Sequence, residues 1–331
     1  MDRILLGHGS GGSLMYELIR EYFAPAFDLK ETGDSAILNL NPHNIAFTTD
    51  SYVISPLFFQ GGNIGELSVF GTVNDLSVSG AMPLFLTAGL IIEEGFPVED
   101  LKRIISSMAE AARRAGVKIV AGDTKVVNRG KGDGIFINTA GIGLLYDGIN
   151  ISPHNMRKGD VVIISGEIGN HGMAIMAERN GITFDPPIKS DTAPLNDLVR
   201  NMIGISKNIH LMRDPTRGGL ATTLKEVAIE SNKCIKIKEE AIPVPPQVIG
   251  ACELLGLDPL YIANEGILVA IVGMEDAEKV LMTMRQHPLG RKAAIIGEVE
   301  DTPQGMVLLE TSIGGTRIIE MLQGEQLPRI C

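Results

Sequence analysis

The last residue of this chain, Cys331, could do chemistry that no other residue type could do from that position. It is one of three cysteines in 331 residues. A free chain end extends by about 3.3–3.6 Å per residue, so a terminal thiol could carry a group between two places. The adjacent α-carboxylate disfavours the thiolate, so an unaided nucleophile is not expected. Taken alone, the position fits a carrier on a swinging arm and an accidental ending equally well.

The other two cysteines, Cys234 and Cys252, lie among apolar residues and are predicted to be buried as small hydrophobic side chains. An odd number of cysteines without C-x-x-C spacing indicates neither a disulfide framework nor structural zinc. The sequence therefore predicts a protein of the reducing cytoplasm.

Four aspartates in similar settings make a second candidate site. Asp50 and Asp123 each follow an apolar, strand-like run, Asp34 follows a glycine, and Asp75 lies on a predicted helix. Ligands of α/β sheets bind at the carboxyl ends of strands. Carboxylate oxygens suit Mg²⁺, which usually also keeps phosphates and waters. The pattern favours a magnesium–phosphate site over four unrelated surface carboxylates.

Two further residues could take part in catalysis. Glu265 is separated by Gly266 from the apolar run 267–272, and burial beside such a run raises the pKa of a carboxyl group and makes it available as a base. Lys125 follows Asp123 by two residues and is either its charge partner or a solvated side chain.

Two segments could bind an anion at a helix N-terminus. Residues 7–12 satisfy G-x-G-x-x-G, but the strand before them is too short for a dinucleotide-binding unit. They remain either an anion-binding loop or a flexible one. In the loop 213–219, Thr216 or Arg217 could contact phosphate or could cap the following helix.

Hydrophobic periodicity predicts an α+β protein of two domains joined by a linker at 150–160. Strands are expected at 45–49, 83–92, 117–122, 136–145, 161–164, 267–272, 294–299 and 306–309. Helices are expected at 99–115, 169–179, 195–203, 220–228 and 274–285.

The composition excludes several classes of partner. A net charge of −11 argues against nucleic acid, which needs a basic surface. No apolar run approaches the roughly 20 residues of a membrane span, and the first residues do not read as a signal peptide, so no membrane association is expected.

Several motifs together resemble the ATP-dependent superfamily of aminoimidazole ribonucleotide (AIR) synthetase, which also holds selenophosphate synthetase and thiamine-phosphate kinase. They lie at 33–36, 48–51, 73–83, 121–124, 214–219 and 264–266. Within that superfamily, residues 8–12, 122–126 and 328–331 resemble the HypE family of hydrogenase maturation proteins. Selenophosphate synthetase is disfavoured because it carries a reactive residue near its N-terminus, and no cysteine precedes Cys234 here.

The resemblance implies a two-domain PurM-like α+β fold. Residues 1–150 would form an ATP- and Mg²⁺-binding domain that dimerises through a β-barrel. Residues 151–310 would form an α+β domain, and residues 311–331 a mobile tail that ends in the carrier Cys331.

The resemblance also implies the site residues. Mg²⁺ would be held by Asp34, Asp50, Asp75 and Asp123. Beside these aspartates, the nucleotide would contact Gly9, Gly11, Gly12, Asn74, Gly122, Thr124, Asp214, Arg217 and Asn264. Cys331, Lys125 and Glu265 would carry the chemistry.

The activity implied is ATP-dependent dehydration of an S-carbamoyl group on Cys331 to a thiocyanate, the source of the cyanide ligand of [NiFe]-hydrogenase. The chain would act as a homodimer, a HypF-type carbamoyltransferase would load the thiol, and a HypC–HypD complex would accept the cyanide. Two alternatives remain open: a small-molecule ATP-dependent synthetase or kinase, and a thiol-bearing assembly scaffold without enzymatic activity.

Overall fold

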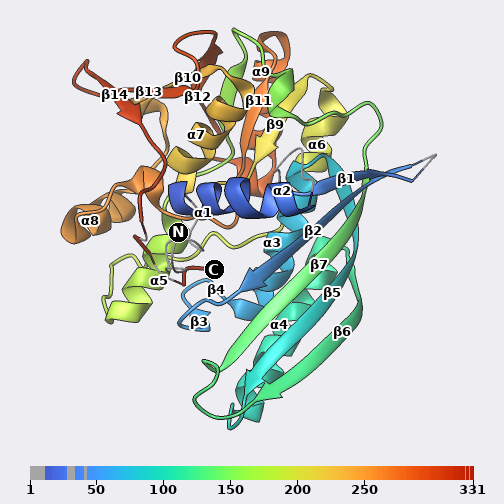
Figure 1. Cartoon of the computed structure of the whole chain (residues 1–331). Coiled ribbons are helices and arrows are strands. Elements are labelled where there is room, and N and C mark those ends of the chain that lie inside the picture. The colour runs from blue at the N-terminus through green and yellow to red at the C-terminus, as the bar shows by residue number, and fades with distance from the viewer. Residues whose placement is uncertain (1–11, 28–33, 41–42, 325, 328) are drawn as a thin grey trace.

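The protein is built around two β-sheets, one in each half of the chain (Figure 1). The computed structural model describes residues 12–27, 34–40, 43–324, 326–327 and 329–331. Within these ranges, no helix is both long and apolar enough to cross a bilayer.

The first sheet has five strands in the order β1-β2-β7-β5-β6. Its pairs are antiparallel except β5 and β6, which are parallel. The strands are β1 (Ala36–Asn39), β2 (Asn44–Tyr52), β5 (Ala81–Glu93), β6 (Lys118–Val127) and β7 (Ile135–Leu145). A short hairpin of β3 (Phe58–Phe59) and β4 (Gly62–Asn63) follows β2.

Helices α3 (Ile64–Val78) and α4 (Val98–Ala115) cover one face of this sheet (Figure 1). Helix α4 is amphipathic: Ile104, Met108 and Ala112 are buried, and Gly116 ends the helix at a φ of 71°, which favours glycine. Helix α3 is buried nearly all round because it also faces the second half of the chain. No described helix covers the opposite face of the sheet.

The second sheet has seven strands in the order β14-β13-β10-β12-β8-β11-β9. Its pairs are antiparallel except β10 and β13. The strands are β8 (Val161–Ile164), β9 (Ile209–Arg213), β10 (Cys234–Lys238), β11 (Val269–Val272), β12 (Ala294–Glu300), β13 (Met306–Glu310) and β14 (Thr316–Ile319).

Helices pack on both sides of the second sheet. Helix α7 (Gly219–Ser231) packs on one side, and α6 (Asn196–Ile205) and α9 (Met274–Gln286) pack on the other. Helices α5 (Asn170–Asn180) and α8 (Pro246–Leu255) instead share one hydrophobic cluster with the first sheet. This shared cluster joins the two halves of the molecule.

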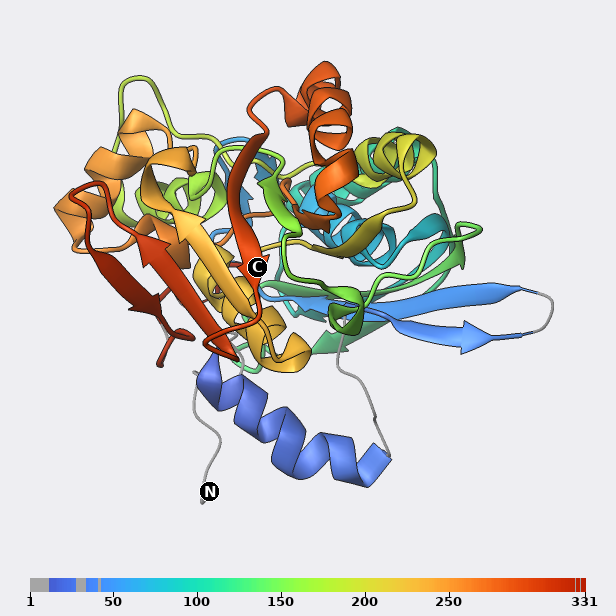
Figure 2. The same cartoon turned by 90° about the horizontal axis from the view of Figure 1, so that it is seen from above.

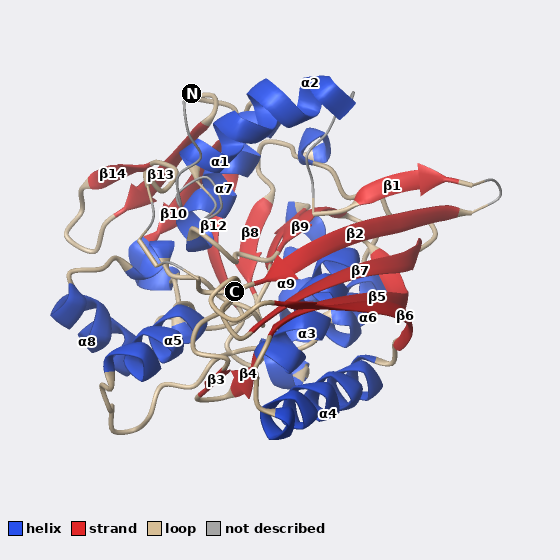
Figure 3. Ribbon diagram, turned by 60° about the horizontal axis from the view of Figure 1, so that its bottom comes forward, coloured by secondary structure: helices blue, strands red, loops and turns tan. Residues whose placement is uncertain are grey.

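The described chain begins with a helical rod beside the second sheet (Figure 2). The rod consists of helix α1 (Ser13–Leu18), a π-helical turn (Ile19–Phe23) and α2 (Ala24–Phe27). After β14 the chain returns to the middle of the molecule, where Cys331 lies (Figure 3).

The predicted mixed α+β fold is confirmed, and most predicted elements are present within a few residues of their expected bounds. One premise of the prediction is wrong. Asp50 lies inside β2 and Asp123 in the middle of β6, not after the ends of these strands. Because most neighbouring strands are antiparallel, their carboxyl ends do not meet at one edge.

Candidate functional site

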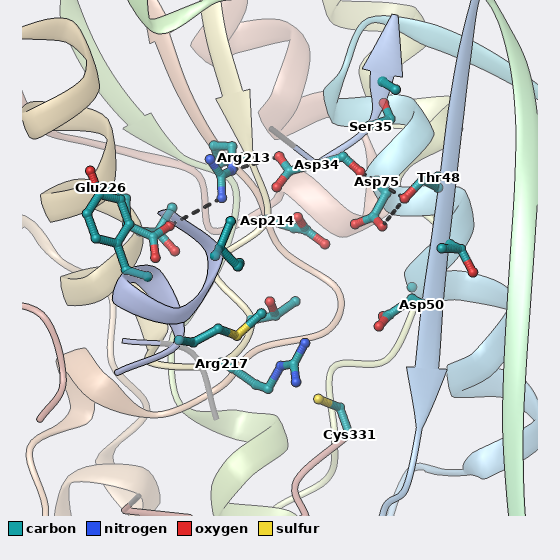
Figure 4. A pocket seen from close by; sticks show the side chains of 18 of the residues that line it. Asp34, Ser35, Thr48, Asp50, Asp75, Arg213, Asp214, Arg217, Glu226 and Cys331 are labelled. Carbon is teal, nitrogen blue, oxygen red and sulfur yellow. Dashed lines mark hydrogen bonds and ion pairs between the residues drawn. The ribbon is translucent and has the colours of Figure 1, made fainter. Parts of the chain in front are cut away.

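A pocket of about 430 Å³ lies between the two halves of the molecule. Figure 4 shows its side chains converging from β2, α3, β9, α7 and the C-terminal tail. Seven carboxylates and three arginines line it: Asp34, Asp50, Asp75, Asp214, Glu226, Glu230, Glu265, Arg20, Arg213 and Arg217. The pocket is therefore acidic overall.

The first domain contributes Asp50 from β2 and Asp75 from α3. Oγ1 of Thr48 donates a hydrogen bond of 3.0 Å to Oδ2 of Asp75 (Figure 4). Burial raises the pKa of Asp75 well above its ordinary value, and repulsion by Asp214, Asp50 and Asp34 raises it further. The carboxylates of the two domains therefore interact across the pocket.

The second domain contributes Arg213, at the end of β9, and Asp214. Nε of Arg213 lies 2.7 Å from Oδ2 of Asp34, and its Nη2 lies 3.4 Å from Oε2 of Glu226. Burial raises the pKa of Asp34 despite this arginine. Burial, followed by repulsion from Asp34, raises the pKa of Asp214 to about 7. One buried arginine does not balance the carboxylates around it.

This charge imbalance is what a bound divalent cation would relieve, so the residues fit Mg²⁺. Asp34, Asp50 and Asp75 are the carboxylates that would hold it. Among the described residues, no three acidic, histidine or cysteine side chains stand close enough to hold a metal on their own. That spacing suits Mg²⁺, which is usually bound by one or two carboxylates together with substrate phosphates and waters.

The C-terminal tail delivers Cys331 to the same pocket (Figure 4). The main-chain N–H of Val53 donates to an α-carboxylate oxygen of Cys331 (3.0 Å), and that of Ser55 donates to the carbonyl of Arg329 (3.2 Å). Ile330 between them is buried and belongs to the cluster that joins the two halves of the molecule. In this structure the end of the tail is therefore docked.

The thiol of Cys331 is protonated in this environment. Burial raises its pKa to about 12; Arg217 lowers it, whereas Glu265, Asp50 and Asp214 raise it further. The charge interaction with Cys331 in turn raises the pKa of Arg217. Cys331, Arg217 and Glu265 thus form one electrostatic group.

Glu265 is buried, and its Oε1 has no hydrogen-bond partner among the described residues. Burial, then repulsion by Asp214, Asp50 and Asp191, raises its pKa well above the ordinary value. The carboxylate of Asp191 accepts hydrogen bonds from the N–H groups of Glu265 (3.2 Å) and Gly266 (3.0 Å). A Cβ atom at position 266 would lie 1.7 Å from the Asp191 carbonyl, so only glycine permits this approach.

Several predicted site residues do not line the pocket of their own chain, and four of these are consecutive. Gly122, Asp123, Thr124 and Lys125 all lie on the exposed edge strand β6. Nζ of Lys125 lies 2.7 Å from Oδ2 of Asp123, and this hydrogen-bonded partner lowers the pKa of Asp123. Lys125 is thus the charge partner of Asp123, and the contacts of all four residues with nucleotide or metal remain predictions.

Asn74 and Asn264 are fully buried and do not line the pocket. Asn74 donates to the carbonyls of Ala193 and Glu265 and accepts from the N–H of Leu195. Asn264 accepts from the N–H of Gly169 (2.7 Å) and donates to the carbonyls of Pro215 (2.9 Å) and Ile262 (3.0 Å). Both hold loops around the pocket, and their nucleotide contacts stay predictions.

The glycine loop is mostly outside the described residues, which include neither Gly9 nor Gly11. Gly12 precedes α1 at a φ of 98°, and a Cβ atom there would lie 2.3 Å from the carbonyl oxygen of Leu322. Gly12 therefore lies against the segment that leads into the tail. Cys234 and Cys252 are buried, as predicted.

The sequence interpretation missed Arg213, Glu226 and Glu230. A signal for the two glutamates was available, because they are four residues apart on the helix that follows the 213–219 loop and so share one face. It also missed His171, whose contact is with the tail 159 residues away. No local pattern indicates that contact.

Comparison with known proteins first defines the class. Residues 32–145 match the family model of the N-terminal domain of AIR synthase related proteins, and residues 157–309 match that of the C-terminal domain. Together these matches span most of the chain, so the protein is an AIR synthase related protein with the PurM-like fold.

The relatives then define the family. The chain is 53% identical over 333 residues to the carbamoyl dehydratase HypE of Cupriavidus necator, covering 99% of this chain and 95% of that protein. A crystal structure of a HypE–HypF complex has a TM-score of 0.88 at 53% identity, covering 92% of this chain and 99% of that chain. A structure of HypE in complex with ATP has a TM-score of 0.85 at 46% identity, covering 99% of this chain and 100% of that chain. The chain belongs to the HypE family.

Proposed function

We propose that this protein is an ATP-dependent carbamoyl dehydratase that converts an S-carbamoyl group on its own Cys331 into a thiocyanate. The observation that carries the proposal is the docked tail, which places the Cys331 thiol in an acidic pocket beside Arg217 and Glu265. The carbamoyl dehydratase activity for which the relatives are named, and the ATP complex of a related HypE, support the same reaction. The product would supply the cyanide ligand of [NiFe]-hydrogenase iron.

The reaction needs activation because hydroxide is a poor leaving group from S–C(=O)–NH₂. Transfer of the ATP γ-phosphoryl group to the carbonyl oxygen, with loss of one N–H proton, gives ADP and S–C(=NH)–O–phosphate. The C–O bond then breaks, phosphate leaves with the electron pair and the remaining N–H proton, and S–C≡N is formed. The oxygen of the carbamoyl group ends in phosphate.

Residues of this chain fit these steps. Glu265 is the candidate base for the first N–H proton, because its buried carboxyl group has a raised pKa and an unpartnered oxygen. Arg217 lies beside the sulfur and stabilises negative charge that develops on the carbamoyl oxygen. Mg²⁺, when bound by Asp34, Asp50 and Asp75, would neutralise charge on the phosphoryl group. The described part of the tail, with Leu327 and Ile330 buried, excludes water from one side.

The proposal includes a homodimer. The uncovered face of the first sheet carries apolar side chains that are 37 to 46% exposed: Phe47, Met82, Phe85, Ile91 and Ile142. A contiguous apolar face of this kind is typical of an interface. Asp123 pairs in register with Gly89, and Lys125 with Ile91, so both charged side chains lie on the same face. A second copy that covers this face would bring Asp123 and Lys125 to its own pocket.

Two protein partners follow from the chemistry of the tail. Cys331 has to leave the pocket to be loaded by a HypF-type carbamoyltransferase, and again to pass cyanide to a HypC–HypD complex. The HypE–HypF complex of a relative supports the first of these contacts.

Mass spectrometry of the C-terminal peptide tests the proposal. After incubation with a carbamoyltransferase system, the peptide should gain a carbamoyl group, and Mg–ATP should then make it one water lighter in step with ATP consumption. Cys331→Ala should abolish both changes, whereas Cys234→Ala, at a buried cysteine outside the pocket, should not. If ATP turnover persists without the tail, a small-molecule kinase is favoured. If no ATP is consumed on a carbamoylated tail, a scaffold is favoured.

A further inference from the structure

The last three residues are held through their main-chain oxygens. The carbonyl of Arg329 accepts from the N–H of Ser55 at 3.2 Å, and an α-carboxylate oxygen of Cys331 accepts from the N–H of Val53 at 3.0 Å. The carbonyl of Ile330, between them, accepts from the second domain. The terminal tripeptide is therefore clamped from both sides.

The donor to Ile330 is a buried imidazole. Nε2 of His171, on α5, lies 2.7 Å from the Ile330 carbonyl oxygen. A carbonyl oxygen can only accept, so Nε2 carries the proton, and Nδ1 accepts from the hydroxyl of Ser190 at 2.8 Å. The ring of Phe59 meets the imidazole edge to face, with centroids 5.6 Å apart. Both nitrogens and the ring plane are thus fixed.

The second domain holds the end of the tail through two side chains of α5. Nη2 of Arg179 donates to the carbonyl of Arg329 at 3.1 Å, two residues before Cys331. His171 bonds Ile330, the residue next to Cys331, through a fixed ring. Of the two contacts, that of His171 therefore constrains the position of the sulfur more directly relative to Glu265 and Arg217, which belong to the same domain.

We propose that His171 is a positioning residue that holds the end of the docked tail against the second domain and so keeps the sulfur of Cys331 beside Glu265 and Arg217. One loop contacts both His171 and Glu265. Ser190 holds the imidazole, and the carboxylate of the next residue, Asp191, accepts from the N–H of Glu265. The imidazole that seats the tail and the candidate base are therefore built on one loop.

The test is the alkylation rate of Cys331 by iodoacetamide, followed by peptide mass spectrometry in the full-length chain. The docked thiol is half-buried with a pKa of about 12 and should react slowly. His171→Leu should speed alkylation of Cys331 at least about tenfold, because the released thiol regains an ordinary pKa of about 8.5. His171→Gln, whose amide N–H can still donate to the Ile330 carbonyl, should stay near the wild-type rate.

His210→Leu is the matched control. His210 is also a buried histidine of the second domain, bonded to Asp160 at 2.7 Å and Asn208 at 2.8 Å, and it does not touch the tail. This variant should leave the alkylation rate of Cys331 unchanged. An unchanged rate in His171→Leu, or an equal increase in His210→Leu, would overturn the proposal.

A second measurement does not depend on a buried substitution. In the wild-type chain, ¹⁵N NMR should show the His171 imidazole with its proton on Nε2, and removal of residues 329–331 should change that signal. An unchanged signal would also contradict the proposal. In the His171→Leu variant, dehydration of the carbamoylated tail should also be slower. Only that measurement rests on the proposed function. Faster alkylation without any dehydratase activity would leave the positioning role intact and reject the enzymatic one.

Discussion

Nδ2 of Asn74 donates a hydrogen bond of 3.1 Å to the main-chain carbonyl of Glu265. Through this contact, helix α3 of the first domain holds the loop of the second domain that carries the candidate base. The same side chain bonds Ala193 at 3.1 Å and Leu195 at 2.8 Å, so one asparagine joins the two domains at three points.

Asn74→Ala should destabilise the protein because it leaves buried partners without hydrogen bonds. Each unsatisfied buried group costs about 1–3 kcal/mol, so a loss of several kcal/mol is expected in denaturant unfolding. Asn155→Ala is the control, because that side chain makes one hydrogen bond in an exposed setting, and it should change the free energy of unfolding by less than about 0.5 kcal/mol. Similar losses in the two variants would contradict the interdomain role of Asn74.

Glu265→Gln should separate catalysis from stability. The carboxyl group already carries a raised pKa among Asp214, Asp50 and Asp191, so a neutral amide should not lower the melting temperature. Loss of the general base should slow dehydration about 10²–10⁴-fold, while carbamoylation of Cys331 continues. Single-turnover assays on the preloaded tail measure this rate. A normal rate would remove Glu265 from the mechanism.

His171 should contribute a pH-dependent part of stability. Burial lowers its pKa from 6.5 to about 4, so between these values the unfolded chain binds a proton that the folded chain does not. The contribution of His171 to the free energy of unfolding is complete above pH 6.5 and is lost as the pH falls toward 4. At 1.36 kcal/mol per pKa unit, the total loss is about 3 kcal/mol.

The comparison of wild type with His171→Gln isolates this contribution. Burial raises the pKa of Asp191 to about 6, so protonation of Asp191 stabilises the folded chain as the pH falls over a similar range. This opposing effect is present in both proteins and cancels in their difference. Urea unfolding from pH 7 to pH 4 should therefore show the difference between the two proteins shrinking as the pH falls. A constant difference would mean that the buried imidazole titrates normally.

Much of the site could be predicted from the sequence because it is carried by local motifs. Asp50, Asp75, Asp214 and Glu265 stand beside apolar runs or glycines, and all four line the pocket. The premise of parallel strands was wrong: Asp123 lies within the edge strand β6 and does not line the pocket described above, so its role as a ligand stays a prediction.

Contacts between distant segments could not be predicted. The partners of His171 and Asn74 are main-chain groups, which every residue possesses, so no residue type marks them. Periodicity shows which face of a helix is buried but not which loop covers it. The fold class and the acidic residues of the pocket can therefore be predicted from local sequence patterns, whereas the docking of the tail cannot.

Phe85→Asp should disrupt the proposed homodimer. A charge in the centre of the open apolar face would be buried without a partner, which strongly disfavours association. Sedimentation velocity should show monomers for Phe85→Asp and dimers for Leu254→Asp, which places the same charge on an exposed leucine of α8. Monomeric wild-type protein would contradict the interface.

A mixed dimer then tests whether β6 serves the partner's pocket. An Asp123→Ala/Lys125→Ala chain and a Cys331→Ala chain should each be inactive alone but regain part of the dehydration when combined. No recovery would mean that Asp123 and Lys125 do not act in the partner's pocket, and an active Asp123→Ala/Lys125→Ala chain would place them outside the chemistry.

The tail should dock mainly through Ile330, and Ile313 offers the matched comparison. Ile330 is 3% exposed in the cluster that joins the two domains, whereas Ile313 is 94% exposed. Truncation of a buried isoleucine to alanine costs about 2–5 kcal/mol. In Ile330→Ala this cost opposes docking rather than folding, because the tail can leave while the rest of the cluster stays packed. The variant should therefore keep its melting temperature, accept carbamoyl as fast as wild type or faster, and dehydrate it at least about tenfold more slowly. Ile313→Ala should match wild type in both steps. Equal dehydration rates in the two variants would mean that the tail is held by its hydrogen bonds alone, and a lower melting temperature in Ile330→Ala would mean that the docked tail is part of the folded core.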